Sequence, residues 1–191
     1  MKKTTKLCAL ALLCAALLPA TASFAGAPLQ LSLWAPRPQL VSALSGVTGL
    51  RLAIYGENTY LKGLDIGGVL KTIGDEDGIV LGLYDKIGGD LTGASLGLVS
   101  DVGSDTLGVT AALVDLHGGD LDGLSLGLYS GVGGTVTGLQ LAMVNRAARL
   151  EGIQLGLLNI ANGGEGLQIG LLNYFDGSPV YEWLPLVNFA F

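Results

Sequence analysis

The residues best suited to chemistry in this chain are one histidine and a few closely spaced acids. His117 is the only histidine among the 191 residues, and the only cysteines, Cys8 and Cys14, lie near the N-terminus. One imidazole with no cysteine near it supplies too few ligands for a zinc site. We therefore expect His117 to pack in the interior or at a corner of the fold.

Two acidic groups have the residue types that a carbohydrate-active enzyme uses as acid and base, namely Asp120 with Asp122 and the run Asp75-Glu76-Asp77. Nothing in the sequence requires these carboxyls to be buried with a shifted pKa, and no Ser, His and Asp set for nucleophilic catalysis is evident. We expect the acids to be solvated at turns. The sequence thus predicts no catalytic, cofactor-binding or metal-binding residue and no cofactor, and the protein is predicted not to be an enzyme.

Glycine-rich corners recur along the chain, reading GGD at 88–90, GSD at 103–105 and GGD at 118–120. They are similar to the Gly/Asp turns of calcium-binding β-rolls, but those turns recur every nine residues and these recur every 15. Glycine at such corners can supply the positive φ of a tight turn, and the aspartate is expected to be solvated. Whether the corners bind calcium stays open.

The first 25 residues have the three parts of a secretory signal: the basic start MKKTTK, an apolar run at 7–18, and a small-residue exit ending at Ala25. The apolar run is shorter than the roughly 18 residues that a membrane-spanning helix needs. The segment predicts an exported protein of the periplasm, outer membrane or cell surface.

Removing this segment changes the charge balance. Loss of Lys2, Lys3 and Lys6 leaves 10 − 3 = 7 basic residues against 16 acids, a net charge of 7 − 16 = -9. The remaining bases form no run, so nucleic-acid binding is not expected. An apolar content of 50% is too high for a disordered chain.

The strongest signal is an internal repeat of 14 or 15 residues. A glycine opens a similar eight-residue phrase, for example GASLGLVS at 93–100, GLQLAMVN at 138–145 and GLQIGLLN at 166–173. The opening glycines are Gly49, Gly63, Gly78, Gly93, Gly108, Gly123, Gly138, Gly152 and Gly166. A degenerate copy, YEWLPLVN, follows at 181–188. A fixed period on this scale is typical of stacked repeats.

Within the phrase, positions two, four and six are almost always Leu, Ile, Val or Met, and positions three and five are polar or small. This alternation predicts a strand in which positions two, four and six face the core. Position three is then expected to form a smooth, outward polar strip open to a glycan, the cell wall or a protein. That strip would consist of Ser95, Thr110, Ser125, Gln140, Gln154 and Gln168.

Two all-β folds can hold these strands. The first is a single-chain parallel β-solenoid of about ten coils, one per repeat; the second is an antiparallel β-barrel of outer-membrane type. The uniform connections favour the solenoid, and in it the asparagines at position eight, such as Asn145, Asn159 and Asn173, can stack and bond one another. The alternating aromatic end at Val187, Phe189 and Phe191 keeps the barrel open.

The predicted organisation has four parts: a signal peptide at 1–25, an opening or cap segment at 26–48, a tandem repeat domain at 49–188, and an aromatic tail at 189–191. The opening segment contains PLQLSLWA at 28–35, which has the rhythm of the repeat.

The tandem GLQ(L/I)GL(L/V)N phrases resemble those of a broad group of uncharacterised bacterial envelope proteins with short Leu/Gly surface repeats. The resemblance covers nearly all of the chain after the signal, and it implies export to the envelope or cell surface. It implies no catalytic residues.

We predict an exported, non-enzymatic repeat protein that serves as a surface or periplasmic structural or binding module. The alternatives are a small outer-membrane barrel and, third, a carbohydrate-active β-helix enzyme. This prediction allows a glycan, cell-wall or protein partner, and it allows an association with the outer membrane. The sequence does not indicate the oligomeric state.

Overall fold

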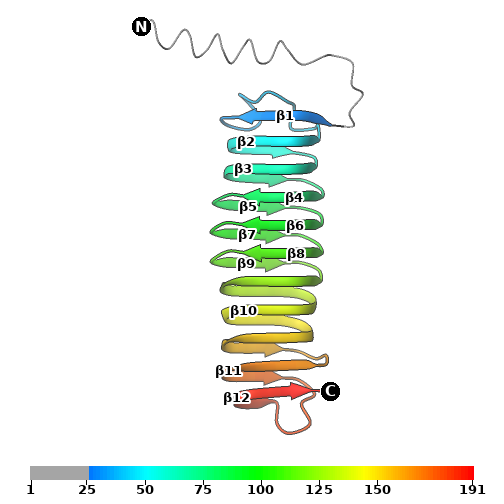
Figure 1. The fold of residues 1–191 in the computed structure, drawn as a ribbon, viewed down its shortest axis with the longest axis vertical. Coiled ribbons are helices and arrows are strands. Elements are labelled where there is room, and N and C mark those ends of the chain that lie inside the picture. The colour runs from blue at the N-terminus through cyan, green and yellow to red at the C-terminus, as the bar shows by residue number, and fades with distance from the viewer. Residues whose placement is uncertain (1–25) are drawn as a thin grey trace, which may run out of the picture.

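The chain folds as a parallel β-solenoid in which the repeats stack along one axis (Figure 1). The computed structural model describes residues 26–191, so the predicted signal segment at 1–25 lies outside the described residues. Residues 26–191 contain strands, turns and bridges but no helix. The solenoid prediction is therefore confirmed.

Twelve strands build the stack, and several coils contain two of them. Their bounds are β1 (Ala27–Ser32), β2 (Val47–Asn58), β3 (Leu61–Thr72), β4 (Glu76–Leu81), β5 (Tyr84–Ile87), β6 (Leu91–Leu96), β7 (Val99–Val102), β8 (Thr106–Ala111), β9 (Val114–His117), β10 (Leu121–Ala161), β11 (Gly166–Phe175) and β12 (Trp183–Ala190). The long element β10 winds through several coils without interruption (Figure 1).

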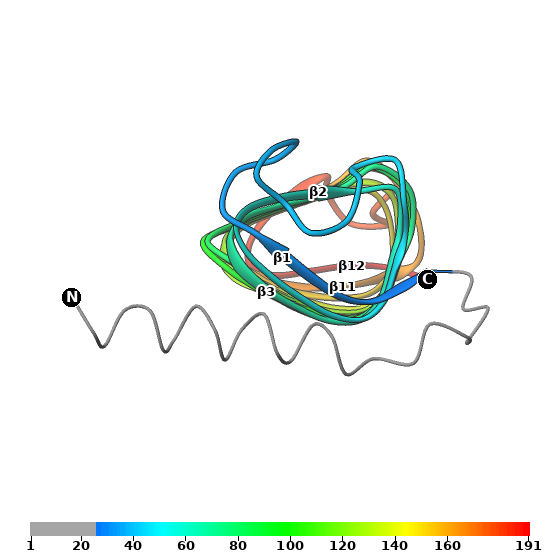
Figure 2. The same ribbon diagram turned by 90° about the horizontal axis from the view of Figure 1, so that it is seen from above.

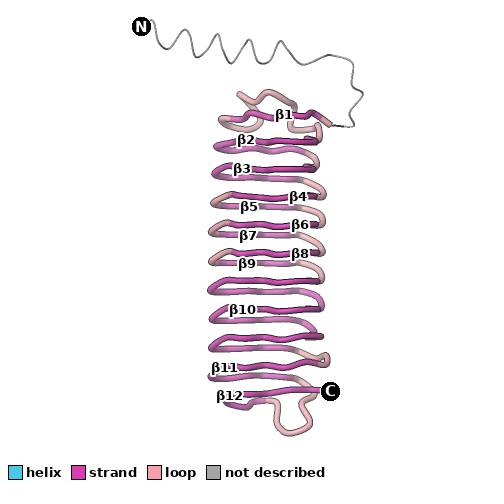
Figure 3. Tube along the Cα trace, in the orientation of Figure 1, coloured by secondary structure: helices cyan, strands magenta, loops and turns pink. Residues whose placement is uncertain are grey.

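Equivalent residues of successive coils lie beside one another in parallel register. Gly78 pairs with Gly93, and Gly93 with Gly108, in the first strand of each coil. The second strands pair in the same way, as β5 with β7 and β7 with β9. Loops gather at the edges and ends of the stack (Figure 3). These parallel registers exclude the antiparallel alternative, in which neighbouring repeats run in opposite directions.

The opening glycine of each repeat is required by a close approach between coils. Gly93 has φ of +132°, and a Cβ placed there would lie 2.0 Å from the carbonyl oxygen of Gly78. The glycines of the GGD corners do not have the positive φ that we expected. They are needed for space instead, since a Cβ on Gly88 would lie 2.1 Å from the Ile73 carbonyl oxygen.

The two ends of the stack differ from its middle. At the N-terminal end β1 pairs in parallel with β2, so the opening segment begins the solenoid. At the C-terminal end β12 runs antiparallel to β11, so the prediction that YEWLPLVN forms a further repeat of the same kind is wrong. Phe189 and Ala190, assigned above to a separate tail, lie within β12, and Phe189 stacks on Phe191.

The strands face the opposite way from the orientation that we expected. Positions three and eight point inward and are fully or almost fully buried, as Ser95 and Ser100 show, whereas Leu96 at position four is 56% exposed. The interior also contains apolar side chains, which come from the residue two before the glycine and from position ten, such as Leu91 and Val102. Alternation determines which residues share a face, but it does not determine which face points inward.

Candidate functional site

An apolar strip runs along the outside of the stack. It consists of positions two, four and six in the nine coils opened by Gly49 to Gly166, and its exposed members include Ile79, Leu96, Leu98, Val109, Leu141 and Ile169. Leu83 and Leu171 are 60% and 65% exposed. Isolated exposed leucines are common on protein surfaces, but a continuous apolar column in every coil is typical of an interaction surface.

The strip lies mainly on the first strand of each coil. Seen along the stack, the chain winds around a flattened loop, and β1, β11 and β12 lie along the same side (Figure 2). Nine coils about 4.8 Å apart give the strip a length of about 40 Å, and positions two to six span about 13 Å. The planar area is thus about 500 Å², within the range of the largest apolar patch on an ordinary monomer.

A flanking column borders the strip along one side. It consists of the residue before each opening glycine: Thr48, Lys62, Asp77, Thr92, Leu107, Asp122, Thr137, Glu151 and Glu165. Lys62 and Asp77 form an ion pair of 2.7 Å between their Nζ and Oδ2 atoms. The hydrogen bond and the charge of Asp77 raise the pKa of Lys62. The flanking column is thus predominantly acidic, with four acids and one base.

The strip ends in a hollow near the N-terminus. This hollow has a volume of about 560 Å³, and its lining includes Leu31, Leu33, Leu40, Leu52 and Ile54. It is open and almost wholly apolar. It extends the strip onto β1 and onto the loop that follows it.

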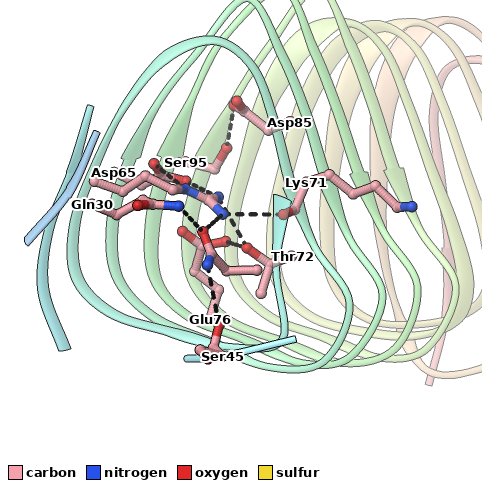
Figure 4. A network of polar contacts seen from close by, with 10 residues as sticks. Gln30, Ser45, Asp65, Lys71, Thr72, Glu76, Asp85 and Ser95 are labelled. Atoms are coloured by element: carbon pink, nitrogen blue, oxygen red, sulfur yellow. Dashed lines mark hydrogen bonds and ion pairs between the residues drawn. The ribbon is translucent and has the colours of Figure 1, made fainter. Parts of the chain in front are cut away.

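Inside the solenoid, the N-terminal coils contain a charged network that includes Asp65, Thr72 and Glu76 (Figure 4). Arg51 lies at its centre. Its guanidinium donates to both carboxylate oxygens of Asp65, with Nε 2.7 Å from Oδ1. It also donates to the Asn58 side chain, the Lys71 carbonyl and the Thr72 hydroxyl. Arg51 and Asp65 are fully buried, so each supplies the charge that the other needs.

Two further buried carboxyls lie next to this network. Burial, and then the charge of Asp65, raises the pKa of Glu76 to about 8, and Thr72 donates to Glu76 over 2.7 Å. Burial also raises the pKa of Asp85 to about 7, although Ser95 donates a hydrogen bond to it. One oxygen of each carboxyl has no hydrogen-bond partner. The expectation that Asp75-Glu76-Asp77 would be solvated is therefore wrong for Glu76.

His117 is buried, as expected for a packed histidine. Its Nδ1 atom lies 2.8 Å from the Thr106 hydroxyl, and its Nε2 atom lies 3.1 Å from Asp115 Oδ2. Burial raises the pKa of Asp115, but hydrogen bonds from His117, Ser125 and Thr110 and the charge of His117 outweigh it and hold this pKa below its usual value. In the coil of Gly108 the polar residues thus lie inside the stack.

The C-terminal coils contain two uncharged ladders instead. Gln168 donates to Gln154 over 2.8 Å, and Gln154 donates to Gln140 over 2.7 Å. The predicted asparagine stack is confirmed, because Asn145 donates to Asn159 and Asn159 to Asn173, over 2.8 and 2.7 Å. Asn188 does not continue it, since its amide bonds to the Tyr181 and Glu182 carbonyls.

The outward polar strip that we predicted at position three does not exist. Ser95, Thr110, Ser125, Gln140, Gln154 and Gln168 are all buried. The amides of this set could have indicated an interior position, because glutamine at one repeat position in three successive coils can satisfy its own donors and acceptors by stacking. Sequence reasoning therefore placed the outer surface on the wrong set of side chains.

The corner aspartates have a structural role. The Oδ1 atoms of Asp75, Asp90, Asp105 and Asp120 each accept a hydrogen bond from the backbone N–H of the equivalent residue one coil further on, at 2.6 to 3.1 Å. Asp122 lies instead in the flanking column and is exposed. Within residues 26–191 no group of three or more His, Cys, Asp or Glu side chains is arranged to hold a metal ion.

The chain matches no protein-family model, no curated protein and no solved structure. The resemblance to envelope repeat proteins therefore stays a prediction. In the described part of the chain, no helix is long and apolar enough to cross a membrane.

Proposed function

We propose that the protein is an exported, non-enzymatic structural module of the cell envelope that acts by association through its apolar strip. One observation carries this proposal: in coil after coil the aliphatic residues of positions four and six, such as Leu96 and Leu98, lie outside, while positions three and eight, which are mostly polar, lie inside. Aliphatic side chains that remain in water in coil after coil forgo the free energy of burial, about 1.5 to 3 kcal/mol for each fully buried leucine.

The chemistry of the strip favours a protein partner over a glycan or cell-wall polymer. Sugars need hydrogen-bonding side chains or aromatic platforms for their hydroxyl groups, because an unpaired polar group is costly to bury. The strip offers Leu, Ile, Val and Met, and the polar residues expected to bind a glycan lie inside. A protein with its own apolar face can cover the strip without burying unpaired polar groups.

Fractionation of a Gram-negative host that produces the full chain tests this proposal. We expect the protein in the periplasmic or envelope fraction, with its N-terminus at Gly26 by mass spectrometry. On a native gel it is expected to migrate as a species larger than the monomer.

The variant Leu96→Lys places a charge in the middle of the strip on a side chain that is already exposed. It is expected to be exported normally but to migrate as a monomer. Asn162→Lys adds the same charge at an exposed corner outside the strip and is the matched control. Retention in the cytoplasm with an uncleaved N-terminus, or identical migration of wild type and Leu96→Lys, would contradict the proposal.

A further inference from the structure

The apolar strip matches a second copy of itself. Within a strip the same side-chain types recur with each coil, about 4.8 Å apart. A second solenoid of the same chain has that spacing along its whole length, whereas a protein without the repeat matches it only locally. A two-fold axis brings one patch onto its own copy, the usual arrangement of homodimers.

The area is sufficient for a stable dimer. From the flanking column to position six the face spans about 20 Å, and the stack of nine coils is about 40 Å long, so about 800 Å² is available on each copy. Specific protein interfaces bury about 800 Å² per partner. Stacked sheets pack about 10 Å apart, so two such faces can interdigitate their aliphatic side chains.

Charge on the flanking column selects one orientation. If the two copies run antiparallel and are centred on the coil of Gly108, each position faces the same position of the mirrored coil. Lys62 then faces Glu151 of the second copy, and Leu107 faces its own copy. Within its own chain Lys62 pairs with Asp77 and Glu151 pairs with Arg149, so the contact between copies joins two existing surface ion pairs into one network of alternating charge. The other pairs are Thr48 with Glu165, Asp77 with Thr137, and Thr92 with Asp122, so no like charges meet.

The strip itself is complementary in the same register. Small residues face large ones at two points, where Gly68 lies opposite Leu157 and Ala94 opposite Leu124. In a parallel arrangement the flanking column would instead face position six, and it would bury charged groups against leucines without partners, which is costly.

A bilayer is a poorer occupant than a second copy. Proteins that lie on anionic membranes flank their apolar face with Lys and Arg. Here the flanking column contains Asp77, Asp122, Glu151 and Glu165 against Lys62 alone.

We infer that two copies of this chain pack face to face and antiparallel through the apolar strip, with Lys62 of each copy paired with Glu151 of the other. The inference rests on the proposed function, because it names the partner of the same strip. The complex is symmetric and closed. Its length equals that of one stack.

Sedimentation equilibrium on the full chain, purified after export, tests the inference, with small-angle X-ray scattering to measure the length of the particle. We expect a concentration-dependent dimer no longer than the monomer. Leu96→Lys is expected to raise the dissociation constant about 100-fold, because the change occurs twice in the dimer. Asn162→Lys is expected to leave the constant within about threefold, as additions outside an interface usually do.

A charge exchange tests the register. Lys62→Glu and Glu151→Lys are each expected to weaken the dimer about tenfold through like-charge contacts, and the double variant Lys62→Glu/Glu151→Lys to restore it. Failure of the double variant to recover affinity would overturn the antiparallel register. A dimer twice the length of the monomer would overturn the face-to-face packing.

Flotation with vesicles of phosphatidylcholine and phosphatidylglycerol separates the remaining outcomes. A monomer that floats with these vesicles would identify a membrane as the occupant and overturn the second copy, while the strip would remain a binding surface. A purified monomer that forms larger species only in cells would overturn the inference and leave the proposed function standing. A chain that is monomeric in cells and in solution would overturn both.

Discussion

The two halves of the solenoid fill the same interior columns with different chemistry. In the N-terminal coils positions three and eight contain Arg51, Asp65 and Asp85; Arg51 pairs with Asp65, and Asp85 accepts a hydrogen bond from Ser95. In the C-terminal coils the same positions contain Gln and Asn, and each amide bonds to its equivalent one coil away. The backbone registers are parallel in both halves.

The difference shows two ways to place polar groups inside a stack. An amide is both donor and acceptor, so identical amides inside a ladder satisfy one another by repetition, and only the end atoms Asn145 Oδ1 and Gln168 Oε1 have no partner. A charge cannot stack on its own copy, so the N-terminal coils must vary their residues to bring opposite charges together. The amide half is therefore repetitive in sequence, and the charged half is degenerate.

The largest expected effect comes from breaking the charged half. Arg51→Met leaves the fully buried Asp65 without its counter-charge, and we expect a loss of about 3 to 5 kcal/mol in the free energy of unfolding. Urea denaturation followed by circular dichroism measures it. Lys62→Met removes an exposed ion pair in the next coil and is expected to leave the free energy of unfolding nearly unchanged. Equal losses for the two variants would show that the network is not a stabilising unit.

Breaking the amide half is expected to cost less. Gln154→Leu removes the middle amide and leaves Gln140 Oε1 and Gln168 Nε2 without their ladder bonds, a loss of about 2 kcal/mol. Gln168→Leu, at the end of the ladder, breaks one such bond and is expected to cost about half as much. Hydrogen exchange read by mass spectrometry places the loss in β10 and β11. A larger loss at the end than in the middle would contradict the ladder.

Only the N-terminal half is expected to lose stability as the pH rises from 5 to 8. The pKa of Glu76, about 8, and that of Asp85, about 7, are raised in the folded chain, so the neutral forms are favoured by folding. Their contribution to stability is complete below the pKa of the unfolded chain, near 4, and is lost as the pH rises to 7 and 8. Hydrogen exchange corrected for its intrinsic rate is expected to show the N-terminal coils opening more readily with rising pH.

The variant Asp85→Asn is the control for this effect. It removes one of the two titrating groups and is expected to flatten the dependence by about 1 to 2 kcal/mol between pH 5 and 8. The coils from Gly138 to Phe175 contain no buried ionisable side chain and are expected to show no change of this kind. Parallel behaviour of both halves would rule out the buried carboxyls as the cause.

The smallest expected effect lies at the corner aspartates, which link successive coils from Asp75 to Thr135. Asp105→Ala removes the acceptor for the Asp120 N–H, at 2.8 Å, and is expected to cost about 0.5 to 1.5 kcal/mol. Asp122→Ala removes an exposed carboxyl of the flanking column and is expected to stay within about 0.5 kcal/mol. Thermal unfolding of the two variants side by side distinguishes them. If Asp122→Ala proved the more harmful, the corner bonds would not contribute as described.

The sequence predicts the stacking correctly and the direction of the side chains wrongly. Spacing between Gly78, Gly93 and Gly108 is enough to expect one coil per repeat, because the period survives whichever way the strand faces. The burial of Leu96 or Ser95 is not encoded in their alternation. Which of the two faces inward depends on other residues, namely the apolar side chains such as Leu91 and Val102 that fill the interior and the amides that bond one another there. Hydrophobicity alone would place Leu96 inside and Ser95 outside.

Glu76 and Arg51 show what sequence reasoning could not find. Glu76 lies between two aspartates at a corner, which is typical of a solvated turn, and Arg51 is a single base between two leucines. Thr72 lies 4 residues from Glu76 and meets it around one corner, whereas Asp65 lies 14 residues from Arg51 and meets it only when the coils stack. A pairing that depends on neighbouring coils has no local signature.

Each opening glycine after Gly49 lies directly against the carbonyl oxygen of the opening glycine one coil earlier, and this close approach limits how the chain can change in length. A single-residue insertion in a first strand would put a side chain where only a hydrogen atom fits. Duplication of a whole repeat instead supplies a glycine at the new point of close approach. The stack is thus expected to lengthen by whole repeats, each adding about 4.8 Å, while single-residue differences, like those between the 14- and 15-residue repeats, are confined to positions outside the first strands.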